Sequence, residues 1–261
     1  MSLDGEERKK IISDILNEAG RISVKDLYER FGVSRETVRR DLDALESEKK
    51  LKKVYGGAVK ITSSGQEPPY LQRSAVYENE KRRIGRKAAG LIDDNDVVFI
   101  DVGTTTLHII PHLSEKRNVT VVTNSVPVLN MLIEMANSKR FDGSVFFVGG
   151  EINTEQMSSF GPIAETAMDN LYISKAFIPT CGVSIEFGLT SFDSREANFS
   201  RKLMLKSRQS FVLTDSSKLG IANLHRFADL SEIDVVICDS DAPEGWKEAL
   251  DRKDVTWLIA D

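Results

Sequence analysis

The residues best suited to chemistry fall in five short polar clusters, each directly after a stretch rich in valine, isoleucine and phenylalanine. A glycine in the first cluster lets a ligand approach the backbone closely, and the three threonines beside it suit the oxygens of a phosphate group. A lysine in the last cluster supplies a point charge of the kind that binds phosphate. We therefore expect a site for a phosphorylated small molecule, built from Asp101, Gly103, Thr104, Thr105, Thr106, Thr123, Asn124, Gly149, Gly150, Cys181, Gly182 and Lys218.

These clusters also have simpler interpretations. A Gly-Thr-Thr-Thr run after a strand is often only a helix cap, and the aspartate and lysine of the last cluster can pair with each other. Cys181 and Cys238 have no recognisable histidine partner nearby in sequence, so we expect small buried thiols and no thiol chemistry. His108 and His112 lack the glutamate of a zinc-protease pattern, which favours surface histidines and no metal site.

A second set of chemically capable residues lies near the amino terminus, where arginines are spaced along a short amphipathic segment. Arginine can hold a guanine edge or a DNA phosphate, and threonine can bond a phosphate or touch a thymine methyl group. On a helical wheel whose buried face is apolar, these side chains flank that face or point outward. The candidate DNA contacts here are Ser34, Arg35, Thr37, Arg39 and Arg40.

A helix-turn-helix would present these side chains to DNA. Apolar residues at helical spacing predict three helices, over 11–19, 24–31 and 35–48. Gly32 suits the tight turn before the third helix, and Ser34 can cap that helix. Residues 51–60 predict two short strands around a turn, a wing that places Lys52 and Lys53 near the DNA backbone. The alternative is a three-helix bundle with a solvated arginine face.

A polar, proline-containing stretch over 61–73 predicts a linker between a first domain over 1–60 and a second over 74–261. In the second domain, residues 79–92 predict a helix, and β-rich stretches then alternate with helical segments. The expected strands are 97–101, 119–123, 145–148, 176–179, 211–214, 235–238 and 255–259. This pattern is typical of an α/β fold, a mostly parallel sheet with helices on both faces and ligands at the carboxyl ends of the strands.

Charge is distributed unevenly along the chain, whose formal net charge is −5. Residues 1–60 hold 14 Lys/Arg against 12 Asp/Glu, a net +2, whereas the remainder holds 21 against 28, a net −7. The more positive first domain favours DNA as its partner. No apolar run approaches the roughly 18 residues of a membrane span, and no signal peptide is evident, so we expect a cytoplasmic protein with reduced cysteines.

Two motifs of the first domain resemble a known family. The gapless run Val33-Ser34-Arg35-Glu36-Thr37-Val38-Arg39-Arg40-Asp41-Leu42 and the downstream Tyr55-Gly56-Gly57-Ala58 resemble the signature of the DeoR family of bacterial winged helix-turn-helix regulators. Tyr55 stands where that family commonly has histidine, which makes it a candidate wing contact. The polar clusters of the second domain resemble the family's sensor domain, whose fold is related to ribose-5-phosphate isomerase and CoA transferases. The resemblance covers residues 6–240.

The resemblance implies a DNA-binding transcription regulator, a repressor of a sugar or carbohydrate-metabolism operon, whose operator binding is modulated by a phosphorylated sugar. It implies a homodimer or larger homo-oligomer on double-stranded operator DNA, with no cofactor and no membrane partner. The rival hypothesis is a sugar-phosphate isomerase-like enzyme with an accessory DNA-binding domain, its acid and base drawn from Asp101, Glu196, Asp215 and Lys218. Ser174 stands where the family usually has aspartate, which predicts an altered choice of effector.

Overall fold

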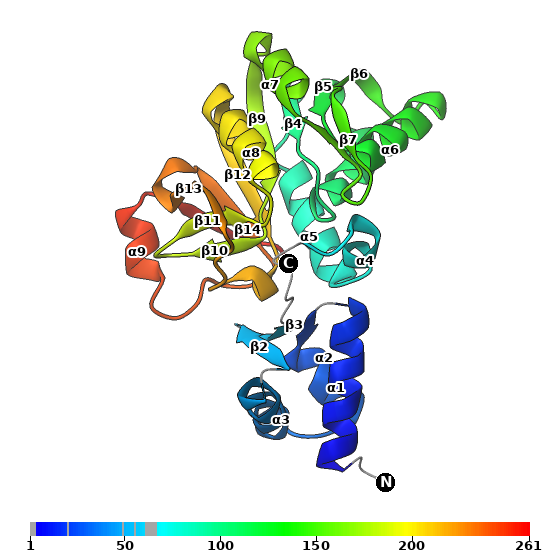
Figure 1. The fold of residues 1–261 in the computed structure, drawn as a ribbon. Coiled ribbons are helices and arrows are strands. Elements are labelled where there is room, and N and C mark those ends of the chain that lie inside the picture. The colour runs from blue at the N-terminus through cyan, green and yellow to red at the C-terminus, as the bar shows by residue number, and fades with distance from the viewer. Residues whose placement is uncertain (1–3, 20, 49, 55, 61–66) are drawn as a thin grey trace.

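The computed structural model describes residues 4–19, 21–48, 50–54, 56–60 and 67–261. Its amino-terminal module packs three helices against a small antiparallel sheet of strand order β1-β3-β2 (Figure 1). The elements of this module are α1 (Gly5–Ala19), β1 (Arg21–Ser23), α2 (Val24–Phe31), α3 (Arg35–Ser47), β2 (Leu51–Val54) and β3 (Gly57–Lys60). The predicted helix-turn-helix and the two strands of the wing are confirmed.

The helices of the module form where apolar side chains recur on one face. Leu27, Val38 and Leu42 are almost completely buried and meet in one core cluster. Gly32 ends α2 in the left-handed conformation, with φ of 64°, which glycine adopts without the steric cost that a side chain would add. An ion pair of 2.7 Å between Arg8 Nε and Asp41 Oδ2 then joins α1 to α3.

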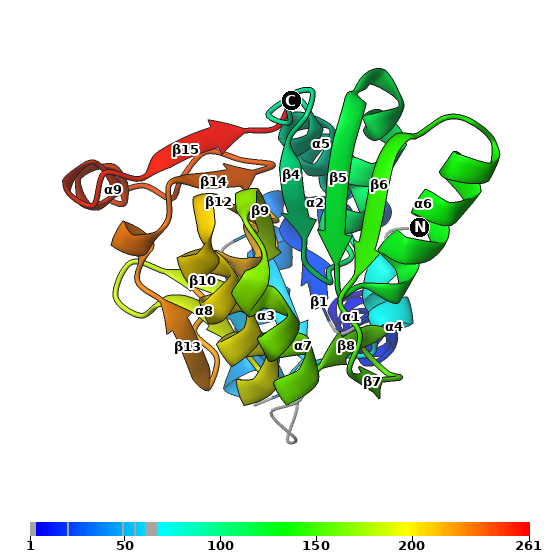
Figure 2. The same cartoon turned by 90° about the horizontal axis from the view of Figure 1, so that it is seen from above.

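A seven-stranded parallel sheet forms the second part of the molecule. Its order is β15-β14-β12-β9-β4-β5-β6, which Figure 2 shows across the molecule. The strands are β4 (Val97–Ile100), β5 (Arg117–Thr123), β6 (Asp142–Phe147), β9 (Ile173–Pro179), β12 (Ser207–Thr214), β14 (Val235–Cys238) and β15 (Thr256–Ile259). All seven predicted strands are present, and the sheet confirms the α/β fold.

Helices cover both faces of this sheet because its central strands are apolar on both sides. In β4, Val98 and Ile100 face one core, whereas Phe99 faces the other, as the alternation of a strand requires. The first core also contains side chains of α5 (Glu78–Ala89), η1 (Thr106–Glu115) and α6 (Val126–Asn137). The second contains side chains of α7 (Pro162–Ala167), η2 (Met168–Asn170), α8 (Ser194–Lys206), η4 (Leu230–Glu232) and α9 (Lys247–Arg252).

Several short elements near the carboxyl ends of the strands were not predicted, because three-residue stretches carry little periodicity. Strands β7 (Glu151–Asn153) and β8 (Ser158–Phe160) form a hairpin. Strands β10 (Gly182–Ser184), β11 (Gly188–Ser191) and β13 (His225–Ala228) form a small antiparallel sheet, and η3 (Ser216–Lys218) follows β12.

The short helix α4 (Tyr70–Ser74) lies within the predicted linker, in contact with α1 and between the amino-terminal module and the large sheet (Figure 1). The backbone N–H of Tyr70 donates to the carbonyl of Glu155 at 2.9 Å, which fixes α4 to the β7–β8 hairpin. The second half of the predicted linker is therefore packed against the α/β domain. Across the described residues, no helix has the length and apolar character needed to cross a membrane.

Candidate functional site

The amino-terminal part of α3 presents its polar side chains to solvent. Ser34 caps the helix, its Oγ accepting the N–H of Thr37 at 3.1 Å and lying 2.9 Å from the Thr37 hydroxyl. Arg39 is exposed, and its guanidinium makes no hydrogen bond or ion pair with the described residues. Its five donors are therefore available for a DNA base edge or a phosphate.

Two neighbouring arginines are held in place by other side chains. Arg35 donates to the Tyr28 hydroxyl at 3.3 Å and lies over the Tyr28 ring at 4.9 Å, which orients it beside α2. Arg40 pairs loosely with Glu36 one turn earlier, at 3.7 Å, and both are well exposed. Exposed pairs of this kind contribute little to stability, so both arginines remain able to exchange their partners for DNA.

The wing contributes one described basic side chain. The ammonium of Lys53 contacts the carboxylate of Asp43 on α3, and the backbone N–H of Lys53 donates to Glu46 at 2.7 Å. These two contacts join β2 to α3. The side chain of Lys52 and the whole of Tyr55 lie outside the described residues.

A cavity lies where the order of the large sheet reverses, between the carboxyl ends of β4 and β9. In doubly wound sheets this point is where ligands bind, because the helices after the two strands leave on opposite faces. The predicted effector residues that line the cavity are Asp101, Gly103, Thr104, Thr105, Asn124, Cys181 and Lys218. They come from the ends of four different strands.

The loop after β4 is tightly packed, and its threonine hydroxyls differ in their hydrogen bonding. A Cβ at Gly103 would lie 2.8 Å from Pro179 and 2.9 Å from the Thr106 hydroxyl, so only glycine fits there. Thr106 donates its hydroxyl to the carbonyl of Asp101 at 2.7 Å. The hydroxyl of Thr105, in contrast, is buried in the cavity lining and has no hydrogen-bond partner.

The carboxylate of Asp101 is hydrogen-bonded to its own loop and to helix α8. Its Oδ1 accepts the N–H of Val102 at 2.8 Å, and its Oδ2 accepts the Ser200 hydroxyl at 2.9 Å. Asn124 accepts the same Val102 N–H at 3.0 Å. Burial raises the pKa of Asp101 to about 6, although these hydrogen bonds oppose the rise. Asp101 therefore shapes the β4 loop.

Five of the predicted effector residues do not line this cavity, namely Thr106, Thr123, Gly149, Gly150 and Gly182. The Thr123 hydroxyl donates to the carbonyl of Ile100 at 2.6 Å and accepts the N–H of Ser125 at 3.0 Å. Gly150 packs against the carbonyl of Phe160, and Gly182 against that of Ile221, too closely for any Cβ. These residues hold the loops that surround the cavity.

The rest of the lining consists of residues that were not in the predicted effector set. Two charged residues, Glu67 and Arg73, come from the predicted linker. The other lining residues absent from our effector set are Val102, Gln156, Ser158, Ser159, Phe160, Pro179, Thr180, Ser191, Glu196, Phe199, Ser200 and Phe227. Of these, Glu196 was considered only as a catalytic acid or base. The one signal in the sequence is the pair of opposite charges on either side of Pro68 and Pro69, since a solvated linker does not require paired charges.

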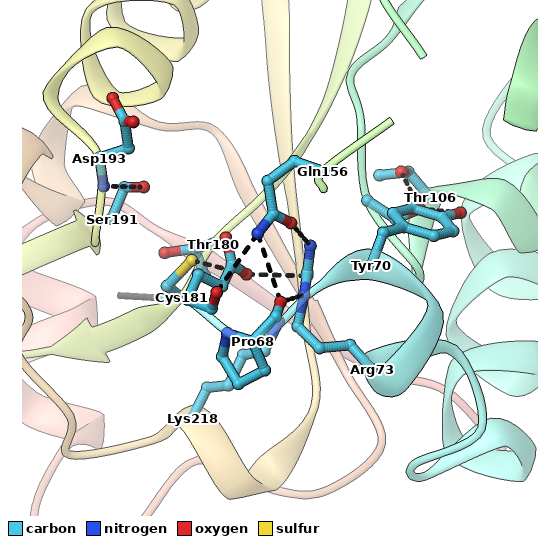
Figure 3. A network of polar contacts seen from close by, with 12 residues as sticks. Pro68, Tyr70, Arg73, Thr106, Gln156, Thr180, Cys181, Ser191, Asp193 and Lys218 are labelled. Carbon is cyan, nitrogen blue, oxygen red and sulfur yellow. Dashed lines mark hydrogen bonds and ion pairs between the residues drawn. The ribbon is translucent and has the colours of Figure 1, made fainter. Parts of the chain in front are cut away.

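Arg73 is the centre of a polar network on one side of the cavity, close to Cys181 and Lys218 (Figure 3). Its Nη1 lies 2.7 Å from Glu67 Oε1, and both side chains are about nine-tenths buried. Its Nε donates to the carbonyl of Pro68 at 2.9 Å, and its Nη2 donates to Gln156. A guanidinium held this way binds carboxylates and phosphates equally well.

Besides Asp101, two titratable groups of the lining have shifted pKa values. Burial raises the pKa of Glu196 well above its ordinary value, and the neighbouring Glu67 carboxylate raises it further while Arg73 opposes the rise. Burial also raises the pKa of the Cys181 thiol, as does Glu67, to which Cys181 donates at 3.2 Å. A thiol held protonated in this way is a poor nucleophile. The second cysteine, Cys238, is buried, and its pKa is raised to about 12.

Lys218 lies 3.9 Å from Asp215 Oδ2, so the pairing considered for these two residues is present, although it is loose. Of the four residues proposed for isomerase chemistry, Asp101, Glu196 and Lys218 line the cavity and Asp215 does not. His108 and His112 are half-buried and not at the surface as expected, and burial lowers the pKa of His108.

Ser174 does not line the cavity, so the expected change of effector choice stays a prediction with no direct contact behind it. Ser174 lies at the amino-terminal end of β9, about 16 Å along the strand from Pro179 at the cavity. Its hydroxyl donates to the carbonyl of Val97 at 2.8 Å and lies 3.1 Å from Asp96. Asp96 also pairs with Lys175, so this end of the strand forms a structural charge cluster.

Comparison with protein families matches both parts of the chain. The DeoR C-terminal sensor domain matches residues 77–240, and the DeoR-like helix-turn-helix domain matches residues 8–64. The chain belongs to the DeoR family of transcriptional regulators. It is 32% identical over 235 residues to the HTH-type transcriptional regulator FruR of Bacillus subtilis, covering 90% of this chain and 91% of FruR. It is 31% identical over 256 residues to the transcriptional repressor GlcR of the same organism, covering 98% and 96%.

This DeoR-family chain also has a more remote similarity to solved structures. D-Ribose-5-phosphate isomerase in complex with phospho-erythronic acid is 18% identical, with a TM-score of 0.39 over 54% of each chain. RipA from Yersinia pestis is 10% identical, with a TM-score of 0.39 over 60% of this chain and 44% of RipA.

Proposed function

We propose that this DeoR-family regulator binds operator DNA through α3 and its wing, and that a phosphorylated sugar in the cavity modulates this binding. The observation that carries the ligand assignment is the Thr105 hydroxyl, buried in the cavity lining without a partner. A buried hydroxyl without a hydrogen bond costs about 1–3 kcal/mol, so its presence favours a ligand that completes it. The backbone N–H groups of Thr104 and Thr105 make no hydrogen bond with the described residues either.

The chemistry of the surrounding groups supports a phosphorylated ligand with several hydroxyls. Free N–H groups before η1 and the buried ammonium of Lys218 suit phosphate oxygens. Glu196 and Asn124 line the same cavity and offer acceptors for sugar hydroxyls. A phosphorylated sugar uses both kinds of group at once.

Operator recognition follows from the exposed side of α3. Arg39 and Arg40 are exposed at the part of the helix that a helix-turn-helix inserts into the major groove. One such module reads only a few base pairs, so we propose that two copies bind two half-sites, separated by about 34–36 Å or a multiple of this distance. The chain would then act as a dimer or a larger homo-oligomer.

We propose that the cavity serves regulation and not catalysis. An isomerase needs a carboxylate that is free to take a proton from the substrate, and both oxygens of Asp101 accept hydrogen bonds, one from the N–H of Val102 and one from the hydroxyl of Ser200 on α8. Conversion between aldose and ketose phosphates, followed with the purified chain, is the direct test. Turnover of any of them would favour the rival enzyme hypothesis.

A thermal-shift panel tests the proposed ligand class. Hexose and pentose monophosphates are compared with the same sugars without phosphate and with inorganic phosphate. A ligand at 100 times its Kd adds about 2.7 kcal/mol to the stability of the folded protein, which a melting curve resolves. We expect stabilisation by at least one phosphorylated sugar and none by its unphosphorylated form. A panel without any stabilising phosphorylated sugar would contradict the proposal.

A further inference from the structure

Two cavities meet beside the predicted linker. The inner one, described above, has a volume of about 40 Å³. The outer one has a volume of about 410 Å³ and is lined largely by the β7–β8 hairpin and the start of α8. Glu67, Gln156, Phe160 and Glu196 line both. These four residues therefore form the passage through which a molecule from solvent reaches Thr105 and Lys218.

The inner cavity is too small for the ligand that its lining suits. A water molecule needs roughly 10–15 Å³ of such volume, so 40 Å³ holds about three waters and no sugar phosphate. Part of the lining must move for a ligand to bind. The loop after β4 and the end of β9 are tied to the sheet, whereas Glu67 precedes the short helix α4 and lies outside the sheet.

The side chain of Glu67 already acts as an anion inside the passage. Its Oε1 lies 2.7 Å from Arg73 and accepts the Cys181 thiol at 3.2 Å, and only 10% of the side chain is exposed. A phosphate group carries the same type of oxygen and binds the same guanidinium face. Glu67 and a phosphorylated ligand are therefore competitors for Arg73.

The position of Glu67 in the sequence connects this competition to DNA binding. Strand β3 of the wing ends at Lys60, so only six residues separate the wing from Glu67. Helix α4, which carries Arg73, also contacts α1 of the DNA-binding module. Any displacement of Glu67 thus changes the point at which the module is attached to the sensor domain.

We propose that Glu67 is an internal competitor that closes the passage, and that a phosphorylated ligand displaces it from Arg73 and so shifts the attachment of the DNA-binding module. This inference rests on the proposed function and supplies its mechanism of regulation. A ligand shifts an equilibrium only by its differential affinity for the two states, and here the difference is the contact with Arg73 that Glu67 gives up. Its departure also removes one carboxylate from beside Glu196.

The test compares Glu67→Gln with Glu151→Gln. Glutamine keeps the size of the side chain and loses the charge that competes for Arg73. Glu151 is an exposed glutamate that lines only the outer cavity, so its substitution makes the same change of charge without touching the passage. Isothermal titration measures binding of inorganic phosphate and of the monophosphates in the panel above. We expect Glu67→Gln to bind about 5-fold more tightly or better, because a larger fraction of molecules is open, and Glu151→Gln to change less than 2-fold.

DNA affinity without ligand is the second measurement, with a duplex selected by the wild-type chain from a random library. We expect Glu67→Gln to shift toward the affinity of the ligand-saturated wild type, and Glu151→Gln to match the ligand-free wild type. If Glu67→Gln fails to fold, Glu67→Asp, whose shorter side chain reaches Arg73 less well, is expected to shift both measurements in the same direction.

The outcomes separate the two proposals. If the wild type binds a phosphorylated sugar and Glu67→Gln binds it equally or more weakly, Glu67 is no competitor and the inference is overturned while the proposed function stands. If ligand binding tightens and DNA affinity does not move, the connection to the DNA-binding module is wrong. If neither chain binds any of the phosphorylated compounds, the proposed function itself fails.

Discussion

Among single residues, Thr105 and Thr106 show how neighbouring hydroxyls are given different tasks. The Thr106 hydroxyl is used within its own loop, at 2.7 Å from the carbonyl of Asp101, whereas that of Thr105 is buried and unbonded. A residue kept in this unfavourable state is expected to favour binding at the expense of stability.

Thr105→Val tests whether Thr105 favours ligand binding at the expense of stability. Valine has nearly the same shape and removes the unbonded hydroxyl, so we expect the free energy of unfolding to stay the same or rise by about 1 kcal/mol. Affinity for the phosphorylated ligand should fall about 5-fold or more, since one hydrogen bond to it is lost. Urea unfolding and isothermal titration measure the two effects. A variant that loses stability and keeps its ligand affinity would show that Thr105 has a structural role only.

Arg39→Ala tests the DNA-facing side of α3. Arg39 is exposed and makes no contact within the described residues, so its removal should leave the fold unchanged. We expect affinity for the selected duplex to fall about 10-fold or more, since a bidentate arginine contact is worth about 1–3 kcal/mol. Gel-shift titration measures the loss, with Arg208→Ala, an exposed arginine of β12, as the matched control. Equal losses of DNA affinity in the two variants would show that Arg39 is not part of the recognition surface.

The raised pKa of Glu196 predicts how stability depends on pH. The folded chain keeps this proton above pH 4.5, the ordinary pKa of a glutamate, whereas the unfolded chain releases it there. The unfolded state then binds fewer protons, so this group lowers stability as pH rises toward its folded pKa. In Glu196→Gln this loss of stability with rising pH is absent. We measure the melting temperature of the variant minus that of the wild type at each pH. We expect this difference to be larger at pH 8 than at pH 5 by about 2 °C or more. A difference independent of pH would contradict the shift.

Among the elements, the turn between α2 and α3 depends on one backbone conformation. Gly32→Ala places a side chain at φ of 64°, which costs about 1–2 kcal/mol. We expect a loss of stability of that size in urea unfolding of the amino-terminal module, together with weaker DNA binding, because α3 begins three residues later. Gly5→Ala, at the start of α1 and with room for a Cβ, should be neutral or stabilising. If both substitutions cost the same, the conformation of Gly32 is not what matters.

The elements also show how far the sequence alone could lead. Apolar spacing located α3 and β4 because each buries a face that matches its own period. Polar residues after the strands pointed to the correct edge of the sheet. Nothing in the sequence separates Thr105 from Thr106, because which hydroxyl turns toward the cavity depends on the close packing around Gly103. Glu67 and Arg73 escaped notice because their place depends on Gln156, far along the chain.

At the scale of the whole molecule, the amino-terminal module carries a net positive charge and the rest of the chain a net negative charge. Residues 1–60 carry a net +2 and the remainder a net −7, by the count of basic and acidic residues given above. The acidic body repels the DNA backbone, so binding must rely on local phosphate contacts of the module.

Affinity for the selected duplex should therefore fall steeply with salt. We expect log K to decrease linearly with log salt concentration, with a slope of about −0.9 for each phosphate neutralised. Replacing Lys53 by alanine should make the slope shallower by about one if Lys53 leaves Asp43 for a phosphate on binding. An unchanged slope would leave Lys53 with its contact to Asp43 in the complex.

The pairing of β4 with β9 at the centre of the sheet has a consequence for mutations that truncate this chain. The helix-turn-helix is translated first, and the loop after β4 follows it. Thr180 and Cys181, which line the cavity from the end of β9, are translated some 75 residues later. A nonsense or frameshift mutation soon after the β4 loop would leave a fragment that carries α3 and β4 but lacks β9, the strand that pairs with β4 beside the cavity. Such alleles are expected to encode the helix-turn-helix without a sensor domain that can bind a metabolite.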